Sequence, residues 1–141
     1  MKIKSKDNKK IKESDVREIE FSFFKFNFSF INNQYSLDTL EDEHKLQFLT
    51  RIQELSERPI KDIAMMRKDK GYELINKEDF KKEICTPIQF NDAAYRKRNS
   101  SDKFMVLRLY PNNNPLPTRI IGKFCSPVFY VIYIDRNHKF L

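Results

Sequence analysis

Three apolar runs in the last third of the chain constrain the fold more than any other feature. They are residues 104–110 (FMVLRLY), 119–124 (RIIGKF) and 128–134 (VFYVIYI). β-Branched and aromatic residues dominate each run, and segments containing Pro, Asn and Ser separate them, so we predict three strands. The last run has no polar residue at all. Such a run is typical of a strand that is covered on both faces and lies near the middle of a sheet.

A fourth run, residues 19–31 (IEFSFFKFNFSFI), gives the strongest strand signal in the chain. Phe24, Phe26, Phe28 and Phe30 alternate with polar residues, so we expect them to share one buried face under a helix. The alternation slips by one residue just before Phe24, which predicts a β-bulge or a sharp bend. Because polar residues interrupt the run at every second position, it is not a membrane span.

Two helices are predicted after this run. The first begins at Asp38, with Glu41 in a capping-box position, and ends before Pro59. Its apolar stripe consists of Leu40, His44, Phe48, Ile52 and Leu55, and Leu46 and Leu49 widen it. We interpret the histidine of this stripe as a buried residue and not as a ligand. Pro59 starts a second, shorter helix that ends at Gly71.

Together these elements predict an α+β fold, an antiparallel sheet of about five strands with the two helices packed on one face. Residues 72–75 would add a short strand to this sheet. Residues 1–17 are rich in Lys and poor in apolar side chains, so we expect a flexible arm there. Residues 18–141 are expected to form a single α+β domain.

The net charge of +7 lies entirely in the last third of the chain, because residues 96–141 hold nine Lys and Arg but only two Asp. Such asymmetry is typical of a protein with a polyanionic partner, although positive charge can also serve to keep a protein in solution. The two cysteines lie forty residues apart, and no apolar secretory signal is seen. We therefore expect a reduced, cytoplasmic protein without a disulfide.

The residue types exclude several kinds of site. Gly71 and Gly122 are the only glycines, so a Gly-rich phosphate-binding loop is impossible. Two Cys and two His at scattered positions do not make a zinc site, and we expect neither a metal nor a cofactor. Cys125 and His138 flank one predicted strand, but Cys125 lies in a tight turn and is interpreted as a buried apolar residue.

What remains is acid–base chemistry by basic and aromatic side chains, which is sufficient to cleave RNA when cations stabilise the phosphorane-like transition state. The candidates in the last three predicted strands are Arg108, Arg119, Lys123, Tyr133 and His138. In a regular strand Arg119 and Lys123 would share one face. Gly122 between them predicts a bulge or the close approach of another backbone. Each candidate is equally consistent with a solvent-facing residue of an ordinary sheet.

The order of these elements resembles that of the RelE-like mRNA interferase toxins of bacterial toxin–antitoxin modules. The resemblance covers roughly residues 38–141: a long helix, a short helix after Pro59, an Arg-bearing strand, and a hairpin followed by His138. It implies cleavage of mRNA, free or on the ribosome, with Arg119 binding the phosphate and His138 acting as acid or base. The ending FYVIYIDRNHKF also resembles small uncharacterised proteins of bacterial mobile elements, which implies an accessory role.

We therefore expect a toxin-like, metal-independent endoribonuclease that acts on mRNA, with Arg119, His138 and Tyr133 as catalytic residues. The expected RNA-binding residues are Arg96, Lys97, Arg98, Lys103, Arg108, Lys123 and Arg136. RNA or the ribosome and a small acidic antitoxin protein are the expected partners, and no membrane is involved. A non-catalytic nucleic-acid- or protein-binding accessory protein of a phage or mobile element is the alternative. A structural domain without a polyanionic partner is the third possibility.

Overall fold

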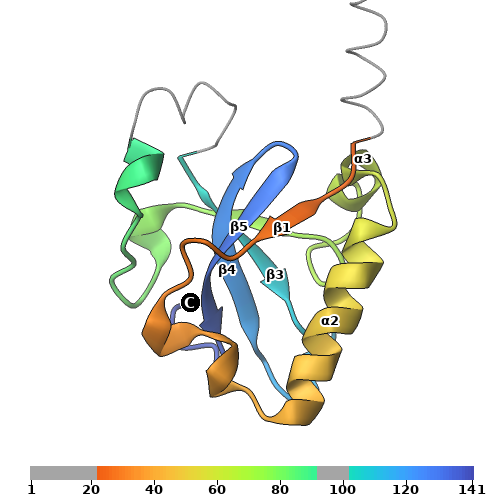
Figure 1. The fold of residues 1–141 in the computed structure, drawn as a ribbon, viewed down its shortest axis with the longest axis horizontal. Coiled ribbons are helices and arrows are strands. Elements are labelled where there is room, and N and C mark those ends of the chain that lie inside the picture. The colour runs from red at the N-terminus through yellow and green to blue at the C-terminus, as the bar shows by residue number, and fades with distance from the viewer. Residues whose placement is uncertain (1–21, 92–101) are drawn as a thin grey trace, which may run out of the picture.

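The computed structural model describes residues 22–91 and 102–141, which form an α+β structure around one five-stranded sheet (Figure 1). The flexible arm predicted at residues 1–17 lies outside the described residues. In chain order the elements are β1 (Lys25–Asn27), η1 (Asn33–Tyr35), η2 (Leu37–Thr39), α2 (Asp42–Ser56), α3 (Ile60–Ala64), β2 (Glu73–Ile75), η3 (Lys77–Asp79), η4 (Ile88–Asn91), β3 (Phe104–Arg108), β4 (Arg119–Cys125) and β5 (Val128–Asp135).

The sheet is mixed, which corrects the prediction of a purely antiparallel sheet. Its strand order is β1-β5-β4-β3-β2. β1 runs parallel to β5, with Phe26 opposite Phe129, whereas every other pair is antiparallel. A short turn fixes the direction of β5 relative to β4, but about a hundred residues separate Phe26 from Phe129, so no turn signal sets the direction of β1. β5 lies between β1 and β4, as predicted for its apolar run.

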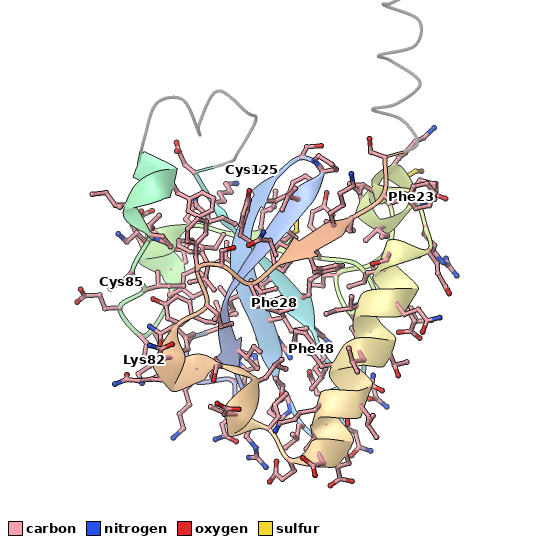
Figure 2. All side chains as sticks on the ribbon, in the orientation of Figure 1. Phe23, Phe28, Phe48, Lys82, Cys85 and Cys125 are labelled. Carbon is pink, nitrogen blue, oxygen red and sulfur yellow. The ribbon has the colours of Figure 1, made fainter. Side chains whose placement is uncertain are left out.

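The Phe-rich run forms a much shorter strand than its sequence predicts. Phe24, Phe26 and Phe28 pack into the same core as Phe48, and the rings of Phe28 and Phe48 lie 5.9 Å apart (Figure 2). Phe30 instead packs on the other side of the sheet, so the expectation that all four rings share one face is wrong. The reason is local, because the Asn27 Oδ1 accepts a hydrogen bond from the Ser29 amide and turns the chain.

At the other end of this run, the chain changes its pairing partner. Phe23 bridges to Pro59, just before α3, and its side chain is 43% exposed. Two residues later, Lys25 pairs with β5 through a hydrogen bond from its amide to the Pro127 carbonyl. The one-residue slip in the sequence pattern therefore coincides with a change of neighbour.

Helix α2 begins at Asp42 and not at Asp38, which corrects the predicted capping box. Ser36 instead caps the short helix η2, because its Oγ accepts a hydrogen bond from the Asp38 amide. The buried residues of α2 are His44, Phe48, Arg51 and Leu55. Leu46 and Leu49 are 65% and 64% exposed, so they do not widen the buried stripe. Leu46 lies about 200° around the helix from His44, which carries it to the solvent side.

Three polar side chains of α2 bind the end of β3. The His44 Nδ1 lies 2.8 Å from the Tyr110 hydroxyl oxygen, and the Gln47 Nε2 donates to the Leu109 carbonyl at 3.0 Å. The Arg51 Nε donates to the Arg108 carbonyl at 2.8 Å. β2 pairs with β3 only as far as Val106. The helix therefore provides hydrogen-bond partners where β2 no longer does.

The sheet has two buried sides. The helix side contains residues of α2, α3 and the sheet, among them Phe48, Leu55, Ile63, Leu107, Ile120 and Phe129. The aromatic side contains Phe80, Ile84, Phe90, Phe104, Ile121, Tyr133 and Phe140. Among the described residues, its outer layer comes from the segment after η3, from η4 and from the residues after β5. Lys82 and Cys85 lie in this outer layer, on the opposite side of the molecule from α2 (Figure 2).

Gly122 marks an irregularity in the sheet, as its sequence position predicts. Ile121 pairs with Tyr133, but Gly122 pairs with Val131, so Ile132 is an extra residue in β5. Ile132 and Tyr133 both face the aromatic side as a result. A Cβ atom at position 122 would lie 1.9 Å from the Tyr130 carbonyl oxygen, so only glycine fits. Both predicted features, the bulge and the close backbone, are confirmed.

Two further findings concern the described residues alone. Cys85 and Cys125 do not form a disulfide with each other. None of the helices in residues 22–91 and 102–141 is long and apolar enough to cross a membrane.

Candidate functional site

Three charged residues lie side by side across β3, β4 and β5. Arg108 pairs with Arg119, and Arg119 pairs with Asp135 on its other flank. Side chains alternate along a strand, so Arg119 shares a face with Ile121, and Asp135 shares one with Tyr133. These neighbours belong to the aromatic side. The row of Arg108, Arg119 and Asp135 therefore lies on the aromatic side, at the end of the sheet where β3 meets the loop to β4.

Arg119 is buried but has spare hydrogen-bonding capacity. Its side chain is 5% exposed, and its Nη1 donates to the Asn113 Oδ1 at 2.7 Å and to the Pro117 carbonyl at 2.8 Å. Among the described residues, its Nε and Nη2 find no acceptor. Burial and then the neighbouring Arg108 lower the pKa of Arg119, but a guanidinium stays charged at neutral pH. An additional acceptor, such as a phosphate oxygen, would match these donors.

Arg108 is half-buried and points at the same loop. Its Nη1 donates to the Pro111 carbonyl at 3.0 Å. No salt bridge joins Arg108 or Arg119 to any carboxylate of the described residues. Like charges directly opposite each other on neighbouring strands destabilise a sheet. A bound anion would remove that repulsion.

Asp135, the third residue of the row, is fully used by the backbone after β5. Its Oδ1 accepts from the Lys139 amide at 3.0 Å and its Oδ2 from the Phe140 amide at 2.8 Å. These bonds fold the chain back over the end of the sheet, so that His138 lies at its turn. His138 has a φ of 57°, in the left-handed region that few side chains adopt.

His138 is partly buried, and its imidazole makes no hydrogen bond to the described residues. Burial, and then the positive charge of Arg119, lower its pKa below the usual 6.5. The Asp135 carboxylate has the opposite but smaller effect on this pKa. The imidazole is therefore mainly neutral at pH 7 and is suited to accept a proton.

Tyr133 lies on the same side, but its hydroxyl is already occupied. It donates to the Cys85 carbonyl at 3.2 Å and accepts from the Cys85 amide at 2.9 Å. Its ring packs against Tyr35 and Phe140, and burial raises its pKa. These two hydrogen bonds hold the Cys85 backbone, in the outer layer, against β5.

The remaining cations expected to bind RNA are distributed over the molecule. Lys123, toward the other end of β4, is buried; its Nζ donates to the Asp102 and Lys103 carbonyls and lies 4.7 Å from the Phe104 ring centroid. Lys103 is exposed beside it. Arg136 binds both carboxylate oxygens of Glu41, at 2.8 to 3.1 Å. The predicted RNA-binding residues Arg96, Lys97 and Arg98 lie outside the described residues.

The structure therefore brings Arg108, Arg119 and His138 into one electrostatic neighbourhood, whereas the Tyr133 hydroxyl and the Lys123 and Arg136 side chains are held by other partners. Sequence reasoning missed the role of Asn113, which holds the Arg119 guanidinium from the loop. Its φ is 61°, a conformation that Asn tolerates better than most residues, so the run of three Asn was the available signal.

In the part of the chain that the structure describes, no three His, Cys, Asp or Glu side chains gather in a way that could hold a metal ion. The chain matches no family model, no curated protein and no solved structure.

Proposed function

We propose that the protein is a toxin-like endoribonuclease that cleaves mRNA without a metal ion. The observation that carries the proposal is the Arg108–Arg119 pair, two guanidinium groups opposite each other on neighbouring strands. Within residues 22–91 and 102–141, both keep unused donors and neither forms a salt bridge. An RNA phosphodiester offers the anionic oxygens that such a pair binds best. His138 supplies a titratable group beside it.

In the proposed reaction, the neutral imidazole of His138 takes the proton from the 2′-hydroxyl of the RNA. The 2′-oxygen attacks the phosphorus, and the bond to the 5′-oxygen of the next nucleotide breaks. Arg119 and Arg108 stabilise the charge that develops on the phosphorane oxygens. The imidazolium then returns its proton to the leaving 5′-oxygen, which leaves a 2′,3′-cyclic phosphate.

The proposed partners follow from the same charge. The positive excess in residues 96–141 favours RNA or the ribosome as the polyanion. A small acidic antitoxin protein would neutralise the same surface by charge complementarity.

A non-catalytic nucleic-acid-binding protein is the second candidate. The observation that favours it is the occupied hydroxyl of Tyr133, because this leaves His138 without a second acid or base of ordinary pKa from the predicted set. Phosphate binding by Arg108 and Arg119 needs no such group, so binding without cleavage would use the same pair.

The full-length protein should be incubated with mRNA in EDTA, with and without ribosomes. His138→Gln should lower cleavage by about 10²-fold or more while RNA affinity stays, since a general base acts only on the chemical step. Arg119→Gln should lower both. Arg67→Gln is the matched control for Arg119→Gln. It also removes one Arg charge, but at an exposed position distant in sequence from Arg119. Wild-type protein that binds RNA with Arg119-dependent affinity but never cuts it would leave only the second candidate.

A further inference from the structure

A concave region lies on the helix side, away from the arginine pair. A cavity of about 510 Å³ opens between α2, α3, the loop after α3 and Pro111. Its cationic lining residues are Arg51, Arg58 and Lys70, and its apolar lining residues include Leu55, Ile63 and Met66. A volume of several hundred Å³ with apolar walls and a few polar groups is typical of small-molecule sites.

Arg51 is the unusual member of this lining. Its side chain is only 4% exposed, and its Nε and Nη2 donate to the Arg108 and Lys70 carbonyls, each at 2.8 Å. It forms no salt bridge with the described residues, and its Nη1 has no hydrogen-bond acceptor there. A buried guanidinium without a carboxylate is costly. Burial accordingly lowers the pKa of Arg51.

The charges around the cavity decide which ligand it favours. Glu54 and Glu57 also line it, but both are exposed. Glu54 and Asp69, which does not line the cavity, raise the pKa of Arg51, but burial lowers it and is the largest cause. The lining holds three cations and two carboxylates, and none of the three cations forms a salt bridge with the described residues. An anionic group is therefore the complement of the cavity floor.

We propose that this cavity binds a small organic anion, with an oxyanion group on Arg51 and an apolar body against Leu55, Ile63 and Met66. The anionic group is a carboxylate or a phosphate monoester, which share the acceptor oxygens that a guanidinium binds. The site is separate from the proposed nuclease site, because the Arg108 side chain lies on the aromatic side whereas the cavity opens on the helix side.

The test uses three probes of the same chain length: hexanoate, hexyl phosphate and the neutral hexan-1-ol. Each is titrated into the full-length protein while the Arg51 guanidinium and backbone resonances are followed by NMR. We expect saturable 1:1 binding of at least one anion, with a shift of the Arg51 side-chain signals. Hexan-1-ol should bind about tenfold more weakly, because it lacks one charge-assisted hydrogen bond. The two anions then identify the preferred oxyanion.

Two variants keep the proposal falsifiable without removing Arg51. Met66→Trp should fill the cavity and abolish anion binding, and Arg58→Gln combined with Lys70→Gln should weaken it about tenfold. Lys61→Gln removes one exposed charge from α3 without touching the lining and should change nothing. Equal binding of hexan-1-ol and the anions, anion binding that survives Met66→Trp in a folded protein, or no saturable binding of either anion would overturn the proposal.

Discussion

The two sides of the sheet use their polar groups in opposite ways. On the helix side, His44, Gln47 and Arg51 each bind a defined hydrogen-bond partner at the end of β3. On the aromatic side, Arg108 and Arg119 face each other and keep donors that find no acceptor among the described residues. A regular helix covers the first side, and short helical turns and the residues after β5 cover the second. Irregular segments on a rigid scaffold commonly carry function, and the site that we propose lies on the side that such segments cover.

The largest effect on stability is expected at Gly122, in the sheet that separates the two sides. Gly122→Ala places a Cβ 1.9 Å from the Tyr130 carbonyl, so β4 and β5 must separate. We expect a loss of roughly 4 kcal/mol or more in the free energy of unfolding, measured by urea denaturation. Gly71→Ala is the matched comparison, because its Cβ would lie 2.6 Å from the Ile63 carbonyl oxygen, a smaller overlap than at Gly122, so we expect a smaller loss. A smaller loss at Gly122 than at Gly71 would contradict the role of the bulge.

A second pair of substitutions compares the packing of the two sides. Phe48→Ala on the helix side removes a fully buried ring and should cost about 3–5 kcal/mol in unfolding free energy. Phe30→Ala on the aromatic side removes a partly buried ring and should cost about 1–2 kcal/mol, since less apolar surface is lost. Both values come from urea denaturation. Equal losses would show that Phe30 is as deeply buried as Phe48.

The two buried arginines give the most direct comparison of the sides. Arg51→Met removes two hydrogen bonds to backbone carbonyls and should cost roughly 2–4 kcal/mol. Arg119→Met should cost about 1 kcal/mol or less, because the lost bonds to Asn113 and Pro117 are offset by relief of the repulsion from Arg108. Its RNA affinity should nevertheless fall and become less dependent on salt. The reverse order of stability would reverse the roles assigned to the sides.

The smallest effect concerns His138 and pH. Burial and Arg119 hold its pKa in the folded protein below the usual 6.5. In the window just below 6.5, the unfolded chain binds the proton more readily, so the unfolding free energy should decrease as the pH falls through it. His138→Gln should remove this part of the pH dependence, measured by urea denaturation between about pH 5 and 7. An unchanged profile would show that Arg119 does not act on the imidazole.

The sequence predicts those parts of the fold that local signals determine. The apolar runs that form β3, β4 and β5 are bounded by turn residues, and the glycine at position 122 predicts the bulge. The parallel direction of β1 depends on a contact made about a hundred residues away, which no local pattern encodes. The early end of β1 follows from one side-chain hydrogen bond, in which Asn27 competes with the strand for backbone donors.

The candidate site divides in the same way. Arg119 and His138 could be selected by residue type and position, but the partnership of Arg108 and Arg119 required the register of two strands. Arg51 could not be found, because charged residues on a helix are ordinarily placed in solvent. Its burial depends on two carbonyl groups, one in β3 and one after α3.

The parallel pairing of β1 with β5 also has a consequence for synthesis of the chain. On the ribosome, the phenylalanines around β1 emerge about a hundred residues before the strand that they must join. Contacts of such long range are slow to form, because a large loop has to close first. Until β5 appears, Phe24, Phe26 and Phe28 lack their final neighbour and remain a surface that chaperones can hold or that nascent chains can aggregate through. The yield of this protein in cells should therefore depend on how quickly its last strand follows its first.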